Sequence, residues 1–385
     1  MWKQSNSSFA LRLGQGAALT AMLALGSLVP CATAQDGGRP DQVYLIDSRG
    51  EAKTVSCVVE TDGLDKVVAD QKGRPRNYDA SSITRVVFGK ITPAFRDAMG
   101  YADAGDLDNA VRKFRVAADD ADARQPVRAS ARFRAATSLM AAAAKDSANT
   151  EWKSVVAEFD RFLSDYPSNR QVPTARRSQA RARLLAGEAQ LAAELGAAIL
   201  GDLDSSGKNA YTLSLCLEAG LESARAFLSA GDVARARTLF TDIERAAGAA
   251  RTDASDETIA MLAIFQERAL LGEGWALLAE DKATQAATFF AGKLRAETSS
   301  AVKFSARLGQ AEALLAQGKH RQAQFEFAAV SALDYSSRDN VAQALSGLIR
   351  CASALPDTDS TERIATWKEA ILTHYGDTPA ALTVQ

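Results

Sequence analysis

The sequence offers few residues that could perform catalysis or bind a metal ion. Its two histidines, His320 and His374, lie far apart, and neither stands beside a second ligand at metal-site spacing. No serine or cysteine lies in a nucleophile-elbow motif, and no phosphate-binding loop follows a strand pattern. The acidic run from Asp202 to Gly207 lacks the glutamate that closes a calcium loop. We therefore expect no enzyme activity, no cofactor and no metal ion.

The densest basic stretch has two interpretations. It holds Arg170, Arg176, Arg177, Arg181 and Arg183, and on a helix residues 177 and 181 share one face while 176 and 183 share another. The first interpretation is a solvated helix surface. The alternative is a partner-binding patch of Arg176, Arg177 and Arg181 for an acidic segment or a phospholipid headgroup. The net charge of −2 gives no basic field, so we expect no nucleic-acid binding.

The N-terminus has the pattern of a secretory signal. Lys3 and Arg12 provide the positive charge, and residues 17–29 form an apolar run too short to span a bilayer. The small residues Ala32 and Ala34 predict cleavage after Ala34, and Pro30 disfavours lipidation at Cys31. We expect residues 1–34 to be a signal peptide and 35–40 a linker. The exported chain then has no transmembrane segment, and the periplasm is its expected location.

Three cysteines remain after export: Cys57, Cys216 and Cys351. They are far apart in sequence and lie in apolar stretches, so they do not form a disulfide framework. We interpret them as buried small hydrophobic residues. A single disulfide between two of them is the alternative.

Residues 41–90 have the alternation of a small β module. Val43 and Leu45, and later Val55, Cys57 and Val59, repeat with a period of two. Gly-containing turns separate these runs at the spacing of hairpins. The pattern predicts four or five strands in a small all-β, SH3-like module. A cap on the helical array is the favoured role, and a peptide-binding groove is the alternative.

From residue 93 to residue 380 the pattern is helical. Apolar residues fall at three- and four-residue spacing, alanine dominates, and turn residues punctuate the chain at intervals that leave helices of about 12 to 18 residues. The sequence therefore predicts a mainly α protein made of six to eight helix hairpins.

Four of these hairpins share a repeated motif. A turn residue is followed by alanine five positions later and by phenylalanine nine positions later, and a large residue stands four positions before the turn. A small residue, for example Ala98 or Gly274, lies three positions before the large one. The copies are Tyr101, Gly105, Ala110 and Phe114; Phe227, Gly231, Ala236 and Phe240; Leu277, Asp281, Ala286 and Phe290; and Leu314, Gly318, Ala323 and Phe327.

This motif resembles the tetratricopeptide (TPR) repeat. The resemblance implies a TPR-like α-α superhelix, in which the small and aromatic residues pack the hairpins together. Phe159 to Arg170 and Trp367 to Ala380 are also similar to the repeat ends of outer-membrane assembly lipoproteins and of the Tol-Pal coordinator protein. Residues 184–215 lack a clear alanine and phenylalanine pair.

The fold implied by the resemblance predicts a scaffold for another protein. Such arrays expose a long concave face, which suits a peptide or a partner helix. We expect an exported, non-catalytic adaptor, with Arg96, Arg225, Glu273 and Glu312 as candidate groove residues. The alternative is a self-associating organiser or spacer of the cell envelope.

Overall fold

The computed structural model describes residues 39–47, 49–146, 151–203, 207–251, 255–296 and 299–384. The described strands and helices lie within one compact unit, Asp36–Gln385. The predicted signal peptide, with its cleavage site and Cys31, lies outside the described residues.

A five-stranded antiparallel sheet opens the described chain. Its order is β4-β3-β2-β1-β5, and a short 3-10 helix, Ala80–Ser82, precedes β5. The first half of β2, up to Cys57, pairs with β1, and its second half, from Val58, pairs with β3. The β2–β3 ladder has a register shift between Val59 and Thr61. The strands are β1 Asp41–Ile46, β2 Ala52–Asp62, β3 Lys66–Asp70, β4 Pro75–Asp79 and β5 Ile83–Val87.

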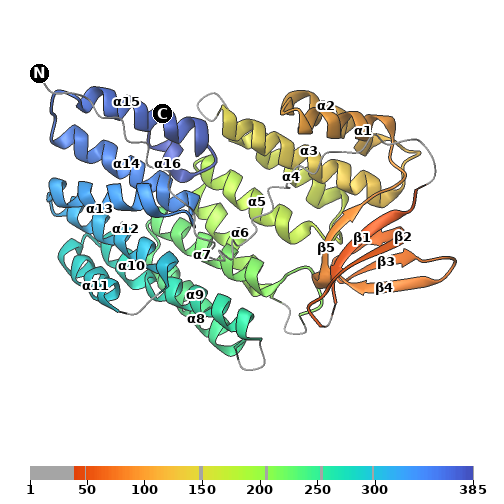
Figure 1. Cartoon of the computed structure of the whole chain (residues 1–385), viewed down its shortest axis with the longest axis horizontal. Coiled ribbons are helices and arrows are strands. Elements are labelled where there is room, and N and C mark those ends of the chain that lie inside the picture. Colours follow the sequence, from red (N-terminus) through yellow and green to blue (C-terminus); the bar gives the residue numbers. More distant parts are fainter. Residues whose placement is uncertain are drawn as a thin grey trace, which may run out of the picture. The chain divides into compact units, whose positions relative to one another are not determined.

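Seven antiparallel helix pairs follow within the described residues (Figure 1). The first helices of the pairs are α1 Pro93–Asp103, α3 Gln125–Lys145, α5 Val172–Leu185, α7 Leu213–Ser229, α9 Asp256–Leu270 continued by α10 Gly272–Ala279, α12 Ser300–Ala316 and α14 Arg338–Ala354. The second helices are α2 Leu107–Asp119, α4 Trp152–Asp165, α6 Ala189–Gly201, α8 Val233–Ala249, α11 Ala283–Arg295, α13 His320–Leu333 and α15 Ser360–His374, with a short α16 Pro379–Leu382 after them. The prediction of a TPR-like superhelix of helix hairpins behind a small all-β, SH3-like module is confirmed.

The turns within the pairs need a backbone conformation that glycine adopts easily. Gly105, Gly231 and Gly318 have φ values of 77°, 80° and 72°, and Asp281 takes the same role with a φ of 60°. This left-handed conformation costs a residue with a Cβ atom more than it costs glycine. Among these four turns, the one at Asp281 is therefore the strained one.

Phenylalanines of the second helices pack against glycines of the following first helix. A Cβ atom on Gly309 would lie 2.3 Å from the Phe290 ring, and one on Gly347 would lie 2.4 Å from the Phe327 ring. Phe290 and Phe327 are fully buried. The missing side chain lets neighbouring helices approach closely, so each ring fills the seam between two repeats.

The sheet shares its core with the first helices. Val43 and Val59 of the sheet lie in one buried cluster with Phe95 and Phe114 of the first pair. The Arg124 guanidinium at the start of α3 forms an ion pair of 2.8 Å with Asp41, and it also donates to the Val59 carbonyl oxygen at 3.0 Å. The β module is thus part of the packed start of the array.

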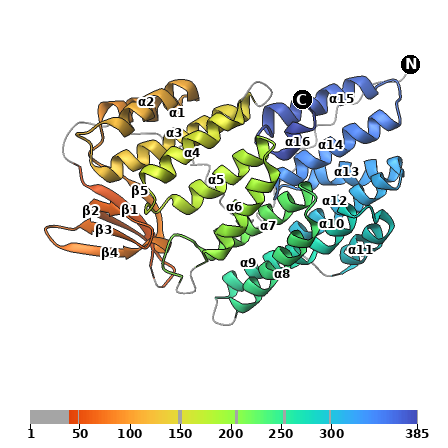
Figure 2. The ribbon, with the colours of Figure 1, turned by 180° about the vertical axis from the view of Figure 1, so that it is seen from behind.

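Early and late helices of the array also contact each other. α3 contacts α15, and α5 contacts α16, as the two opposite views indicate (Figures 1 and 2). A Cβ atom on Gly376, in the loop after α15, would lie 2.0 Å from the Ala144 carbonyl oxygen of α3. Segments more than 200 residues apart in sequence are therefore in close backbone contact.

Candidate functional site

Charged side chains of four first helices form a surface that we call the inner face. α5 and α7 present them at helical spacing, so that each helix turns one charged stripe toward its neighbours. The opposite stripe of α7 carries Leu217, Ala224 and other buried residues, which fixes how this helix is rotated. The inner face comprises Arg177, Arg181, Glu218, Glu222, Arg225, Arg268 and Asp339.

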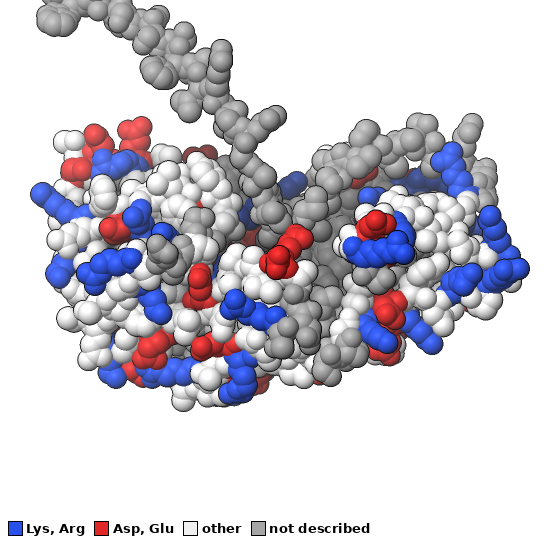
Figure 3. Space-filling model, turned by 60° about the horizontal axis from the view of Figure 1, so that its bottom comes forward, with Lys and Arg blue, Asp and Glu red and all other residues white. Residues whose placement is uncertain are grey.

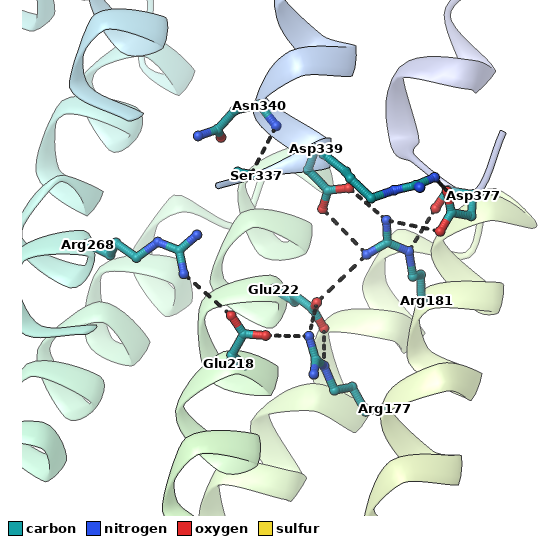
Figure 4. A network of polar contacts seen from close by, with 10 residues as sticks. Arg177, Arg181, Glu218, Glu222, Arg268, Ser337, Asp339, Asn340 and Asp377 are labelled. Carbon is teal, nitrogen blue, oxygen red and sulfur yellow. Dashed lines mark hydrogen bonds and ion pairs between the residues drawn. The ribbon is translucent and has the colours of Figure 1, made fainter. Parts of the chain in front are cut away.

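Arg177 joins α5 to α7. Its guanidinium donates to Glu222 at 2.7 and 3.0 Å and to Glu218 at 2.6 Å. Glu218 also lies 3.4 Å from the Arg268 guanidinium of α9. Figure 4 shows these groups as a chain of alternating charges across three helices. A bidentate arginine–carboxylate pair combines strong hydrogen bonds with a defined geometry. The pair of Arg177 with Glu222 therefore fixes the distance between α5 and α7.

Arg181 joins α5 to a distant part of the chain. It donates to Asp339 at the start of α14 at 2.7 Å and to the backbone carbonyl oxygen of Asp377 at 2.7 Å (Figure 4). A Glu222 carboxylate oxygen lies 3.8 Å from the same guanidinium. Arg338 holds the Asp377 carboxylate from the other side at 3.1 Å. Arg181 is therefore the polar centre of the contact between early and late helices.

The charges of the network stabilise one another. Burial alone would raise the pKa of Asp339, but Arg181, then Arg225 and Arg338, hold it below its ordinary value. Burial would likewise lower the pKa of Arg181, and Asp339, Glu222 and Asp377 together raise it instead. Both partners are thus ionised near neutral pH.

The interpretation of the basic stretch as a solvated helix surface is wrong. Each of its five arginines forms an intramolecular ion pair, and the side chains are at most 23 % exposed. Sequence spacing correctly separates the 177 and 181 face, but it cannot reveal that acidic residues from other helices cover it. The pairs are Arg170 with Asp62, Arg176 with Asp202, Arg177 with Glu218 and Glu222, Arg181 with Asp339, and Arg183 with Glu188.

The four candidate groove residues differ in their surroundings. Glu273 pairs with Arg237, and Glu312 pairs with Arg350. Arg225 lies on the inner face, in the electrostatic field of Arg268, Asp339 and Glu222, yet it makes no ion pair within 4.0 Å with any residue that the structure describes. Burial, then Arg268, lowers the pKa of Arg225. Arg96 lies on α1 and is half-buried.

The structure places the repeat-motif residues between and within the helix pairs. Gly105, Gly231 and Gly318 lie in the turns, and Tyr101 is half-buried. Leu277 is also half-buried, and Asp281 is exposed at its turn. The other motif residues are buried: Ala110, Phe114, Phe227, Ala236, Phe240, Gly274, Ala286, Phe290, Leu314, Ala323 and Phe327.

The pair α5 and α6 lacks the repeat motif in the sequence because its phenylalanine position holds glycine. Gly187 makes the turn between α5 and α6 with a φ of 81°, Ala192 follows five residues later, and Gly196 stands nine residues later. A Cβ atom on Gly196 would lie 2.8 Å from the Ser223 side chain of α7. In the sequence, only the turn glycine Gly187 and the alanine Ala192 five residues later indicate this repeat.

Other candidate chemical residues are placed apart. His320 begins α13 and is half-buried, whereas His374 ends α15 and is exposed. Cys57, Cys216 and Cys351 are buried free thiols. Among the described residues, no group of three or more His, Cys, Asp or Glu side chains could hold a metal ion. In the same part of the chain, no helix combines the length and apolar character needed to cross a membrane.

The outer surface carries mixed charge and an apolar spot. Basic and acidic side chains are interspersed over the face shown in Figure 3. On and just after α13, Phe325 is 75 % exposed and Tyr335 is 91 % exposed. Phe325 borders a shallow hollow that is also lined by Leu314 and Arg321.

Comparison with known proteins identifies no family for this chain. No protein-family model matches the sequence, and no curated protein matches it. Among solved structures, a tetratricopeptide repeat protein from Parabacteroides merdae is 15 % identical, with a TM-score of 0.48, over 73 % of this chain and 92 % of that one. Putative kinesin light chain TPR-like repeats from Podosopora anserina are 18 % identical, with a TM-score of 0.27, over 52 % of this chain and 97 % of that one.

Proposed function

We propose that this protein is an exported, non-catalytic scaffold that holds a partner protein on the inner face of its helical array. The observation that carries the proposal is the concentration of arginine and carboxylate side chains on the first helices α5, α7, α9 and α14. The seams around Phe290 and Phe327, by contrast, are apolar.

Export and an envelope location belong to the same proposal. They rest on the charged start, the apolar run and the small-residue site before Gln35, and on the resemblance of Tyr166-Pro167 and Tyr375-Gly376 to repeats of envelope proteins. Periplasmic fractionation of the tagged full chain tests this part. N-terminal sequencing of the mature protein is expected to begin at Gln35, and an intact Met1 would contradict it.

Affinity capture from the envelope fraction tests the scaffold role. The tagged chain is crosslinked in its own cells, purified and analysed by mass spectrometry. We expect one specific partner protein, recovered from wild type and reduced in a variant with Arg177 and Arg181 both changed to Gln. A partner that is retained equally by this variant would contradict binding through the inner face.

The exposed apolar residues of α13 favour one alternative function. Phe325, Leu333 and Tyr335 present aromatic and aliphatic surface, which mixed-charge surfaces of monomers seldom expose together. A self-associating envelope organiser would use such a surface. Recovery of only the bait as higher oligomers, abolished by Phe325→Ser, would support this alternative over the scaffold.

A further inference from the structure

The inner face has one more positive than negative side chain. With Arg338 and Asp377 added, the count is five guanidinium groups against four carboxylates: Arg177, Arg181, Arg225, Arg268 and Arg338 against Glu218, Glu222, Asp339 and Asp377. Four of the five arginines have an ion-pair partner within 4.0 Å. Arg225 is the remaining one among the described residues.

The position of Arg225 follows from the spacing on α7. Glu218, Glu222 and Arg225 stand at positions i, i+4 and i+7, so they share the stripe that faces α5 and α14. The two glutamates of this stripe are already engaged by Arg177. Arg225 is half-buried, and burial and Arg268 oppose its charge more than the carboxylates of Asp339, Glu222 and Glu218 favour it.

Two acidic residues that contact Arg181 are not part of its own repeat. Asp339 accepts through its carboxylate at 2.7 Å, whereas Asp377 accepts through its backbone carbonyl oxygen at 2.7 Å and keeps its carboxylate 4.0 Å away. Asp339 lies 158 residues and Asp377 lies 196 residues further along the chain. These groups reach Arg181 across the contact between early and late helices. A carboxylate from another molecule could therefore replace them without opening the packing of α5 against α6 or α7.

We propose that the inner face binds an acidic peptide segment of the partner, and that Asp339 and the loop carrying Asp377 occupy part of this site when the partner is absent. One carboxylate of the segment pairs with Arg225, and another replaces Asp339 or Asp377 on Arg181. This inference rests on the proposed scaffold function and specifies the chemistry of its partner. Charge-assisted, bidentate pairing gives arginine its selectivity for carboxylates.

Fluorescence anisotropy with a defined probe tests the inference. The probe is a short labelled peptide of alternating Glu and Ala, and its control has Gln in place of Glu. We expect the intact protein to bind the Glu peptide, more weakly as salt concentration rises, and not to bind the Gln peptide. Equal binding of the two peptides would overturn the inference.

Variants locate the binding on the inner face. Arg225→Gln is expected to weaken binding about tenfold or more. It should not lower the Tm substantially, because Arg225 makes no ion pair with a described residue. The matched control is Arg235→Gln on α8, whose exposed side chain pairs with Asp232 and Glu194 and lies over the Phe227 ring, away from the inner face. Unchanged affinity in the Arg225 variant, or an equal loss in the Arg235 variant, would overturn the inference.

Removal of the Asp377 carboxylate, which occupies the site in the absence of a partner, should strengthen peptide binding. Asp377→Asn is expected to raise affinity for the Glu peptide several-fold, because the Arg338 and Arg181 guanidiniums lose a competing carboxylate. Absence of Glu-peptide binding in both the wild type and this variant would also overturn the inference. If envelope capture yields a partner whose recovery does not depend on Arg225, the scaffold function stands and the acidic-segment inference fails.

Discussion

Arg181 on α5 and Asp339 on α14 form an ion pair of 2.7 Å although 158 residues separate them. Their side chains are 22 % and 32 % exposed. The pair therefore links the early and late parts of the helical array at the surface that we assign to partner binding. The same ion pair thus contributes to the stability of the array and occupies an arginine that we propose binds the partner.

Breaking this pair should destabilise the array modestly. Arg181→Gln and Asp339→Asn are each expected to lower the free energy of unfolding by about 1–2 kcal/mol, because each change removes a charge-assisted hydrogen bond. Urea unfolding of both single variants and the double variant measures the coupling. Strictly additive effects would contradict a direct interaction.

The contribution of Asp339 should depend on pH. Its pKa is lowered in the folded protein, so its stabilising effect is complete above the ordinary carboxyl value of about 3.9 and is lost as the pH falls through the lower folded value. The difference in unfolding free energy between wild type and Asp339→Asn should hold near neutral pH and shrink below about pH 4. A difference that grows on acidification would contradict the assignment.

The contact of Phe290 with Gly309 should make the glycine irreplaceable. Gly309→Ala is expected to lower the free energy of unfolding by about 1–3 kcal/mol, because the new methyl group meets the ring. Gly292→Ala on α11 is the control, since nothing lies within 4 Å of a Cβ atom there. That change should stabilise the helix by up to about 1 kcal/mol. Equal effects of the two substitutions would contradict the close packing of the Phe290 ring against Gly309.

The turn at Asp281 should be improved by glycine. Asp281 has a φ of 60°, where Gly105, Gly231 and Gly318 serve the other three copies. Asp281→Gly is expected to stabilise the protein by up to about 1 kcal/mol, because the strain of the left-handed conformation is relieved. Calorimetry measures this as a higher Tm, whereas Gly318→Asp should lower it. A lower Tm for Asp281→Gly would contradict the turn geometry.

The three described thiols should react slowly. Burial raises the pKa of Cys57 and Cys351 to about 11 and that of Cys216 to about 12. Near pH 8 very little thiolate is present, so a thiol reagent should label the folded protein far more slowly than the urea-unfolded protein. Rapid labelling of the folded chain would contradict their burial. Fewer than three thiols in the unfolded chain lacking residues 1–34 would indicate a disulfide.

The sequence predicted the helix pairs because their turns and seams depend on local spacing. Gly231, Ala236 and Phe240 recur at fixed intervals, and each acts within one hairpin or on its neighbour. The pair α5 and α6 lies in the predicted helical region, but its motif was not recognised because Gly196 stands at the phenylalanine position, where Ser223 of α7 approaches closely. Such a contact between helices leaves no periodic signal.

The inner face could be predicted only in part. The spacing of Arg177 and Arg181 placed them on one face, and Arg225 was recognised as a groove candidate. Their carboxylate partners could not be found, because Asp339 and Asp377 reach Arg181 only after the late helices pack against the early ones. Long-range charge pairing depends on the tertiary fold and not on local pattern.

The most direct test of the scaffold function is site-specific photo-crosslinking in living cells. One protein carries the crosslinking amino acid at Ser214, on the inner stripe of α7, and its control carries it at Thr241, an exposed position of the second helix α8. The scaffold account predicts a crosslinked partner from position 214 that is absent from position 241. A partner crosslinked only from position 241, or from neither position, would contradict binding through the inner face.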